Sequence, residues 1–371
     1  MTGEHADLRH MARALQLARR GLYTADPNPR VGCLLVRDGE VVGQGWHERA
    51  GEPHAEINAL REAGGRAQGA TAYVTLEPCS HHGRTPPCAD ALIEAGVKRV
   101  VAAMEDPNPQ VAGKGLARLR AAGIEVQCGL LEREAAALNP GFVKRMRSGR
   151  PWVRCKLAMS LDGRTAMASG ESRWITGEAA RADVHRLRAR SSAIVSGIGT
   201  VLSDDPALTA RIDGVAILQP LRVVLDPHLA TPATAQLLRQ PGSTLIVCAH
   251  DDAAAREALE GAGAEVLCLP GGEDRIDLNA LMDRLAEREI NEVLVETGAV
   301  LSGAVLRAGL IDELIVYMAP HLMGDQARGL FHLPQLKRMD ERIALEIEDI
   351  RAVGRDWRIL ARVREAGARP R

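Results

Sequence analysis

The chain has 371 residues, of which 46% are hydrophobic and only 2% aromatic, and its formal net charge at pH 7 is −1. This length exceeds the size at which a single hydrophobic core stops growing, so we expect two domains with cores built from Ala, Leu and Val. Charges of both signs are interspersed, which argues against a nucleic-acid partner, and no stretch reaches the roughly 18 apolar residues of a membrane helix.

An amphipathic helix is expected over residues 5–20. This segment carries acidic residues and lacks the apolar core of a signal peptide, so we expect a cytoplasmic protein. The seven cysteines are odd in number and widely scattered, which is not the pattern of a disulfide framework. Five of them stand in apolar runs and are expected to be reduced core residues: Cys33, Cys128, Cys155, Cys248 and Cys268.

A strand hairpin and a second helix are expected next along the chain. The run VGCLLVRDGEVVGQGW turns at Asp38-Gly39, and the helix 54–63 begins after Pro53. Strands and helices then alternate as far as IEVQCG at 124–129. This alternation predicts a mostly parallel sheet with helices on both faces, which binds ligands where helix starts meet strand ends.

The residues that open two of these helices carry the clearest chemical signal. His54 is followed two residues later by Glu56, and Cys79 and Cys88 come after the strand expected over 71–78. One imidazole and two thiolates provide three zinc ligands and leave the fourth tetrahedral position open, as in catalytic zinc sites. This is the ligand set of a zinc nucleobase deaminase, in which a glutamate that does not bind the metal carries protons.

The spacing of the two cysteines leaves an alternative open. The generic deaminase motif has two residues between its cysteines, whereas eight separate Cys79 from Cys88. A structural zinc site, or two ordinary buried cysteines with His54 as a helix cap, would also fit the pattern. A structural site needs a fourth ligand, which His81 or His82 could supply.

These residues resemble the deaminase half of the bifunctional deaminase/reductase family of riboflavin biosynthesis, which has the same eight-residue spacing. The other matching stretches are Asn28-Pro29-Arg30-Val31-Gly32, SHHGRTPP and Asp106-Pro107-Asn108-Pro109 followed by VAGKG. The resemblance implies that His54, Cys79 and Cys88 hold Zn2+. It also makes Glu56 the catalytic proton carrier and places Asn28 at the pyrimidine substrate.

A domain boundary is expected in the polar segment 145–150, so that residues 1–147 form one domain and residues 148–371 another. The alternation of strands and helices restarts at VRCKLAMS and continues to ELIVYMAP at 313–320. The last fifteen or so residues end in AGARPR and are expected to form a frayed tail.

The second half carries weaker chemical signals. Gly197-Ile198-Gly199 lacks the third glycine of a dinucleotide fingerprint and is expected to be a tight turn at a strand end. The helix after Glu296 is either a phosphate cradle or the product of an ordinary strand-to-helix turn, and the residues leave both interpretations open. Arg188 and Arg211 could hold a phosphate bidentately, although arginines in so Arg-rich a chain are more often solvated.

Residues 151–363 resemble the reductase half of the same family, which has a dihydrofolate-reductase-like fold and binds NADPH. The matching segments are KLAMSLDGRTA, GESRWIT, GIGTVLSDDPALTAR, VETGAVLSGAVL and DELIVYMAP. The resemblance implies NADPH contacts from Ala158, Trp174, Thr200, Asp204, Pro227, Gly298, Ala299, Val300, Leu301, Ser302, Gly303 and Ala304. It implies substrate contacts from Ser172, Arg188, Leu208, Arg211 and Glu296. Pro227 stands where the family can place a serine and offers only its carbonyl group.

The resemblance thus implies an α/β protein with a cytidine-deaminase-like zinc domain and a dihydrofolate-reductase-like domain. The implied reactions are hydrolytic deamination of 2,5-diamino-6-(5-phosphoribosylamino)pyrimidin-4-one and NADPH reduction of the ribosyl chain to ribityl. A homodimer is also implied, and Lys156 and Asp204 are candidate proton partners. Two alternatives are a deaminase whose second half only binds substrate or dimerises, and a non-enzymatic protein with a structural zinc site.

Overall fold

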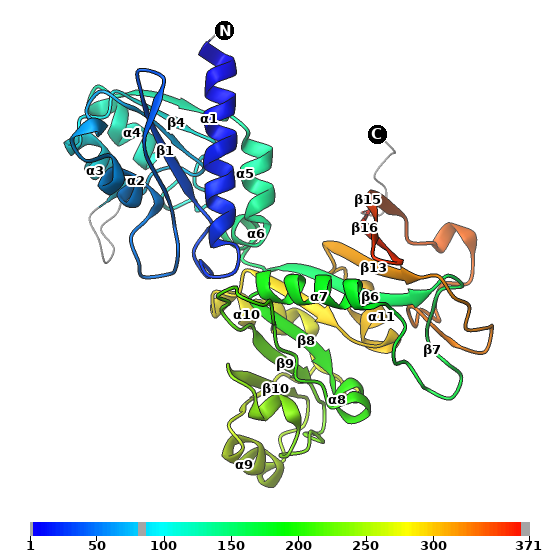
Figure 1. The fold of residues 1–371 in the computed structure, drawn as a ribbon. Helices are drawn as coiled ribbons and strands as arrows, with labels where there is room; N and C mark the ends of the chain where they lie inside the picture. The colour runs from blue at the N-terminus through cyan, green and yellow to red at the C-terminus, as the bar shows by residue number, and fades with distance from the viewer. Residues whose placement is uncertain (1–2, 81–86, 365–371) are drawn as a thin grey trace. The chain divides into compact units, whose positions relative to one another are not determined.

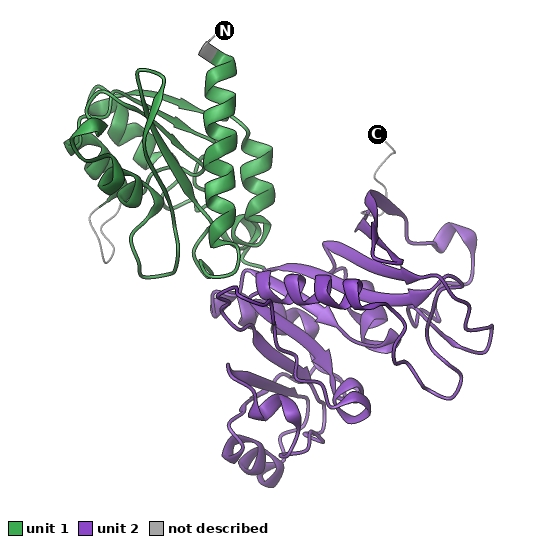
Figure 2. Cartoon of the chain, in the orientation of Figure 1, with its two compact units in different colours: residues 1–150 green, residues 151–371 purple. Residues whose placement is uncertain are grey.

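The computed structural model describes residues 3–80 and 87–364 and contains two compact units, 1–150 and 151–371 (Figure 2). The division falls between Arg150 and Pro151, against an expected boundary after residue 147. Each unit has its own sheet and its own hydrophobic cores. The two units are therefore described separately.

The sheet of the first unit has five strands in the order β2-β1-β3-β4-β5. Their bounds are β1 (Gly32–Arg37), β2 (Glu40–Trp46), β3 (Thr71–Val74), β4 (Arg99–Ala102) and β5 (Glu125–Cys128). β1 is antiparallel to β2 and β3, whereas β3, β4 and β5 are parallel to one another. The expected tight turn between β1 and β2 is confirmed, because Asp38 and Gly39 both have positive φ angles.

Helices cover both faces of this sheet, as the alternation predicted (Figure 1). One face packs against α2 (Ala55–Ala63), α3 (Cys88–Glu94) and α4 (Lys114–Ala121). The other packs against α1 (Gly3–Ala18), α5 (Glu132–Leu138) and α6 (Pro140–Ser148). Gly45 in β2 allows α2 to lie close to the sheet, since a Cβ there would be 2.4 Å from the Ala55 carbonyl oxygen.

The sheet of the second unit has nine strands in the order β11-β10-β9-β8-β12-β6-β13-β16-β15. Neighbours from β11 to β13 are parallel, and β16 and β15 continue the sheet in antiparallel pairing. The bounds are β6 (Trp152–Ser160), β8 (Ala193–Gly197), β9 (Leu221–Leu225), β10 (Thr244–Cys248), β11 (Glu265–Cys268), β12 (Glu292–Glu296), β13 (Glu313–Ala319), β15 (Leu345–Val353) and β16 (Asp356–Val363). Strands β7 (Arg164–Ala166) and β14 (Arg328–Gly329) form a separate pair.

Helices also lie on both faces of the second sheet. One face packs against α10 (Leu278–Glu287) and α11 (Ala299–Arg307). The other packs against α7 (Glu178–Arg190), α8 (Ile198–Asp204) and α9 (Ala253–Gly261). Four 3-10 helices complete the described elements, namely η1 (Arg19–Gly21), η2 (Gly64–Ala67), η3 (Gln236–Arg239) and η4 (Met339–Glu341).

Three expectations from the sequence were wrong. Gly197-Ile198-Gly199 is not a tight turn, because β8 ends at Gly197 and α8 begins at the next residue. The chain continues as a strand into the segment expected to fray, because β16 pairs with β13 as far as Ala361 and with β15 as far as Val363; residues 365–371 lie outside the described part. Cys128 is exposed rather than in a core, because it ends the edge strand β5.

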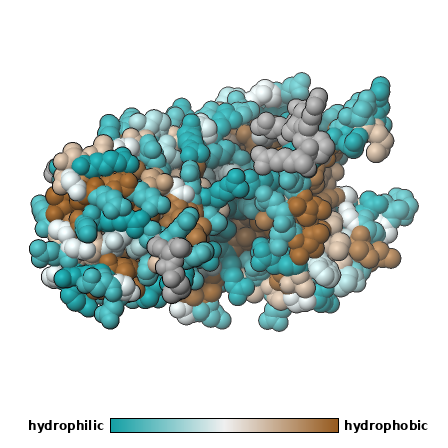
Figure 3. Space-filling model, turned by 90° about the horizontal axis from the view of Figure 1, so that it is seen from above, coloured by the Kyte–Doolittle hydropathy of each residue, from teal (hydrophilic) through white to brown (hydrophobic). Residues whose placement is uncertain are grey.

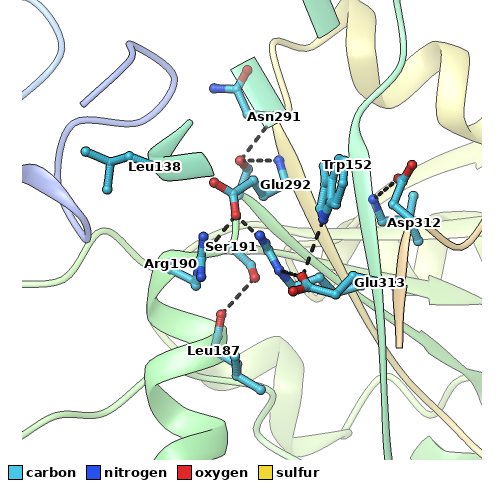
Figure 4. Close-up of polar contacts among 12 residues, drawn as sticks. Leu138, Trp152, Leu187, Arg190, Ser191, Asn291, Glu292, Asp312 and Glu313 are labelled. Carbon is cyan, nitrogen blue, oxygen red and sulfur yellow. Dashed lines mark hydrogen bonds and ion pairs between the residues drawn. The ribbon is translucent and has the colours of Figure 1, made fainter. Parts of the chain in front are cut away.

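A charged cluster is buried at the amino-terminal ends of β6, β12 and β13 (Figure 4). The Arg154 guanidinium forms ion pairs with Glu292 and Glu313, and Arg190 approaches Glu292 at 3.4 Å. Trp152 Nε1 donates a hydrogen bond to Glu313 Oε2 at 3.4 Å. Buried carboxylates require such partners, so this cluster ties three central strands together.

The surface agrees with the absence of long apolar segments in the sequence. Among the described residues, no helix is long and apolar enough to cross a membrane. On the face seen in Figure 3, hydrophilic residues are widespread and hydrophobic ones form separate patches.

Candidate active sites

Three possible metal ligands converge in the first unit. His54 is the N-cap residue of α2, Cys88 is the first residue of α3, and Cys79 follows the end of β3 by five residues. His54 Nδ1 lies 3.2 Å from Cys88 Sγ and 3.6 Å from Cys79 Sγ. All three ligand atoms lie within 4.8 Å of one another, so one ion could contact them together.

This donor set fits zinc, because an imidazole and two thiolates are ligands that zinc binds tetrahedrally. The backbone N–H of Cys88 donates to Cys79 Sγ at 3.3 Å, and the N–H of Ala89 donates to the Cys79 carbonyl oxygen at 3.1 Å. Hydrogen bonds from Cys88 and His54 lower the pKa of the Cys79 thiol, which favours the thiolate that a metal requires. Among the described residues the cluster has these three members, and His81 and His82 lie outside the described part.

Glu56 lies beside the cluster without belonging to it. The His54 backbone is extended, with ψ at 164°, so the helix begins only after it and the two side chains can approach the same site. Glu56 is 3% exposed, and burial raises its pKa to about 7. A carboxyl group with a pKa near neutrality can both accept and release a proton, as a general acid–base requires.

Asn28 is joined to this site through His47, which the sequence analysis missed. Asn28 Nδ2 lies 3.0 Å from His47 Nε2, and His47 Nδ1 lies 3.3 Å from the Pro53 carbonyl oxygen. The His47 ring meets the His54 ring edge-on, with centroids 5.4 Å apart. Burial lowers the pKa of His47, so its imidazole is neutral at pH 7. Only its place seven residues before His54 could have singled it out in the sequence.

Most candidate residues of the second unit lie at or after the carboxyl ends of parallel strands, the usual ligand edge of such sheets, whereas Ser172 and Trp174 follow β7 of the separate antiparallel pair. Lys156 in β6 and Glu296 at the end of β12 are partners in the strand register. Ala158 is two residues farther along β6, opposite Tyr317 of β13. The other candidates lie in segments that follow strand ends: Ser172, Trp174, Thr200, Asp204, Leu208, Arg211, Pro227 and residues 298–304.

Glu296 is the centre of a charged group at this edge. Arg188 Nε and Nη2 donate to Glu296 Oε1 and Oε2 at 2.6 and 2.9 Å, and Lys156 Nζ lies 3.6 Å from Oε2. Burial acts to raise the pKa of Glu296, but the charges of Arg188 and Lys156 outweigh it and lower the pKa to about 2. The N–H groups of Arg188 thus donate to a carboxylate and, through Nη1, to the Thr209 carbonyl oxygen at 3.2 Å, rather than facing an open phosphate site.

Arg211, unlike Arg188, is exposed and is not paired with a carboxylate among the described residues. Its guanidinium lies 3.3 Å from Thr209 Oγ1 and 3.4 Å from His185 Nε2. Nearby Leu208 is buried and has a positive φ of 47°, which fixes the course of this segment. Arg211 is therefore the candidate arginine that remains available to an anionic group.

The cofactor candidates differ in accessibility. Trp174 and Val300 are 68% and 70% exposed, whereas Ser302 is fully buried and its N–H donates to the Gly298 carbonyl oxygen. A Cβ at Gly303 would lie 2.3 Å from the His332 carbonyl oxygen, so this glycine permits close packing of α11. The Pro227 carbonyl oxygen accepts hydrogen bonds from Ala249 and His250 N–H groups at 3.0 and 2.9 Å.

The donor chemistry of this edge fits a dinucleotide. Gly298 caps α11 without a side chain, so the first N–H groups of the helix can face an anion.

Lys156 and Asp204, the candidate proton partners, have different neighbours. Lys156 faces Glu296, whereas Asp204 is 3.5 Å from Arg173.

Two family models match the chain. The cytidine and deoxycytidylate deaminase zinc-binding region matches residues 4–104, and the RibD C-terminal domain matches residues 151–359, more than half of the chain. The chain belongs to the RibD family. The Escherichia coli riboflavin biosynthesis protein RibD is 54% identical over 94% of this chain and 96% of its own length. That of Haemophilus influenzae is 49% identical over 94% and 95%, respectively.

Solved structures agree over both units. Acinetobacter baumannii RibD has a TM-score of 0.92 and 46% identity and covers 98% of this chain and 100% of its own. A deaminase/reductase from Thermotoga maritima has a TM-score of 0.87 and 32% identity, with the same coverage. The α/β fold class with a cytidine-deaminase-like and a reductase domain is thus confirmed.

Family membership also confirms the predicted activities. This RibD family member is a bifunctional enzyme of riboflavin biosynthesis with deaminase and reductase activities. The alternative of a non-enzymatic protein with a structural zinc site is therefore wrong. So is the alternative in which the second half only binds substrate or dimerises, because residues 151–359 match the RibD C-terminal domain and the chain matches a deaminase/reductase structure along its length.

Proposed function

We propose that the first unit hydrolyses 2,5-diamino-6-(5-phosphoribosylamino)pyrimidin-4-one and that the second reduces the ribosyl chain of the product to ribityl with NADPH. The T. maritima relative is described as a diaminohydroxyphosphoribosylaminopyrimidine deaminase and 5-amino-6-(5-phosphoribosylamino)uracil reductase, which supports these substrates. The observation that carries the deaminase assignment is the convergence of His54, Cys79 and Cys88 beside buried Glu56.

In the deaminase site, His54, Cys79 and Cys88 would hold zinc, which supplies Lewis-acid activation of water at neutral pH. Glu56 takes a proton from the attacking water and delivers it to the amino nitrogen, which leaves as ammonia while a ring carbonyl forms. Burial of Glu56 raises the pKa of its carboxyl group, which suits a group that both accepts and releases a proton.

Asn28 and His47 would hold the pyrimidine in this site. The Asn28 side chain has both a donor and an acceptor, which suits the edge of a pyrimidine ring. His47, fixed by the Pro53 carbonyl oxygen, would restrict the orientation of the Asn28 amide. This arrangement would place the ring with little loss of conformational entropy on binding.

In the reductase site, NADPH would supply the hydride, and residues of the second unit would hold it against the sugar. The cofactor would contact Ala158, Trp174, Thr200, Asp204 and the start of α11, with Pro227 at its margin. Ser172, Leu208 and Glu296 would line the substrate side. We assign the substrate phosphate to Arg211, and we assign Arg188 the role of holding the Glu296 carboxylate in place.

NADPH oxidation on addition of the still-aminated substrate to zinc-loaded protein tests both activities, because hydride transfer then requires prior deamination. The Glu56→Ala variant should not oxidise NADPH with this substrate. It should do so with the deaminated pyrimidine, which bypasses the first site. Release of ammonia by Glu56→Ala at the parent rate would contradict the role of Glu56.

A homodimer is part of the proposal and is supported by the edge of the nine-stranded sheet. β15 is the last strand in the sheet order, and Leu345, Ile347 and Ile350 on it are 44%, 58% and 52% exposed. These three apolar side chains lie opposite Val363, Ala361 and Ile359 in the strand register and so share one face, which is suited to packing against a second copy of the chain. Ile347→Lys should therefore shift the mass measured by light scattering from dimer to monomer.

A cytoplasmic location stays a prediction.

A further inference from the structure

Glu77, two residues before Cys79, makes an unusual set of hydrogen bonds. Its side chain is buried, and its carboxylate accepts four backbone N–H groups from the segment 106–116. Oε2 accepts from Asp106 and Gly113 at 3.0 and 2.9 Å. Oε1 accepts from Gly115 and Leu116 at 2.7 and 3.2 Å. Charge-assisted bonds of this kind are stronger than those between neutral groups.

Three of these N–H groups belong to the start of α4. Gly113 is the N-cap residue and has no side chain to cap the helix, while Gly115 and Leu116 are the second and third helical residues. Glu77 therefore caps α4 from a distant part of the chain, and its negative charge interacts favourably with the helix dipole. Because the Glu77 carboxylate already accepts these N–H groups, the start of α4 is not open to a substrate phosphate.

The same contacts hold the segment that leads to Cys79. A Cβ at Gly115 would lie 1.9 Å from the Pro78 carbonyl oxygen, so the first turn of α4 packs directly against the residue before Cys79. On its other side, Cys79 accepts the N–H groups of Cys88 and Ala89 at the start of α3.

A side-chain contact closes the arrangement. Arg118 of α4 forms an ion pair with Asp90 of α3. The chain from Glu77 to Cys79 is thus clamped between the starts of two helices, one of which carries Cys88. A shift of α4 would be transmitted to the position of the Cys79 sulfur.

We propose that Glu77 is a positioning residue of the deaminase centre, which fixes Cys79 by binding the start of α4 and which contacts neither metal nor substrate. The inference rests on the proposed function in one respect, the assignment of Cys79 as a zinc ligand. Residues that orient metal ligands typically change metal affinity or activity by about 10- to 100-fold when replaced.

The test uses Glu77→Ala and Glu77→Gln in the full chain. Asp7→Asn is the matched control, because Asp7 is also a buried carboxylate, bonded to Tyr73 and Arg99, but lies on α1 at the opposite face of the sheet. Zinc dissociation constants are measured by chelator competition. Amide hydrogen exchange at Gly115 and Leu116 is measured in zinc-free protein, and the reductase reaction with deaminated substrate reports on the second unit.

Glu77→Ala should raise the zinc dissociation constant by about 10- to 100-fold and speed exchange at Gly115 and Leu116, with Glu77→Gln intermediate. Reductase activity should stay within about twofold, because each unit has its own core. Asp7→Asn should lower the midpoint of thermal unfolding and leave the zinc dissociation constant within about twofold, as expected of a purely structural change remote from the ligands.

A Glu77→Ala protein with a zinc dissociation constant and deaminase kcat within about twofold of the parent would overturn the inference. Cys79→Ser in the same assay tests the proposed zinc ligands separately from the positioning role of Glu77. If it too binds zinc like the parent, the proposed ligand set is wrong. If it loses zinc while Glu77→Ala does not, only the positioning role is wrong. Should Glu77→Ala fail to fold, Glu77→Gln decides by the same comparison.

Discussion

The guanidinium of Arg188 and the carboxylate of Glu296 form a bidentate ion pair, with N–O distances of 2.6 and 2.9 Å, at the ligand edge of the second sheet. The two residues are 108 positions apart in the chain, on α7 and at the end of β12. Because Arg188 is paired with Glu296, the two candidate arginines are expected to have different roles. Arg188 binds the Glu296 carboxylate, whereas exposed Arg211 is the arginine to which we assigned the substrate phosphate in the proposal above.

Replacing these arginines should therefore have different effects. Arg211→Ala should raise the KM for the deaminated substrate about 10- to 100-fold, the loss expected for one or two charge-assisted hydrogen bonds, with an unchanged unfolding temperature. Arg188→Ala should destabilise the second unit by about 3–5 kcal/mol, because Glu296 stays buried with reduced compensation. Steady-state kinetics and thermal unfolding separate the two, with exposed Arg275→Ala as control. Equal KM effects from Arg188→Ala and Arg211→Ala, without destabilisation, would contradict this division.

The ion pair also predicts a pH dependence of stability. The pKa of Glu296 falls from an ordinary 4.5 to about 2 in the folded protein. The stabilisation is therefore complete above the unfolded pKa and is lost as the pH falls from about 5 to 2, with a total of about 3 kcal/mol. Chemical unfolding of the second unit at several pH values should show this decline. The decline should be about 3 kcal/mol smaller in Glu296→Gln, because Asp162, Asp251 and Glu265, whose pKa values are also lowered, still contribute to it; an identical profile for both proteins would refute the assignment.

Removal of zinc should separate the two activities. A strong chelator should abolish release of ammonia, because the deaminase site then lacks its Lewis acid, and added zinc should restore it. NADPH oxidation with the deaminated pyrimidine should continue at an unchanged rate, since no described residue of the reductase site belongs to the metal cluster. Loss of both activities on chelation would show that the second site also depends on the metal.

Arg154 should be critical for the stability of the second unit. Arg154→Met removes the cation shared by buried Glu292 and half-buried Glu313, leaves Glu292 only partly compensated by Arg190 at 3.4 Å, and should lower the free energy of unfolding by about 3 kcal/mol. Adding Glu292→Gln and Glu313→Gln to this variant should recover much of the loss, because the uncompensated charges are removed. Denaturant unfolding measures both effects. A single variant as stable as the parent would show that the cluster is not needed.

The sequence determined the local structure around the deaminase site. Pro53 predicted the start of α2 to within one residue, and Asp38-Gly39 predicted the turn between β1 and β2. These features depend on neighbouring residues, such as a proline that favours an extended backbone before a helix start. The family resemblance then supplied the fold of both domains, which the comparisons confirm.

Only the tertiary structure decided which side chains support those residues. His47, Glu77 and the Arg188–Glu296 pair have no local signature, because each acts through residues distant in the sequence. Cys128 was misassigned for a related reason, since an apolar run does not reveal whether its strand lies at a sheet edge. Hydrophobic pattern and turn chemistry are local properties of a chain, whereas burial, hydrogen-bond satisfaction and pKa are set by whatever the fold brings alongside.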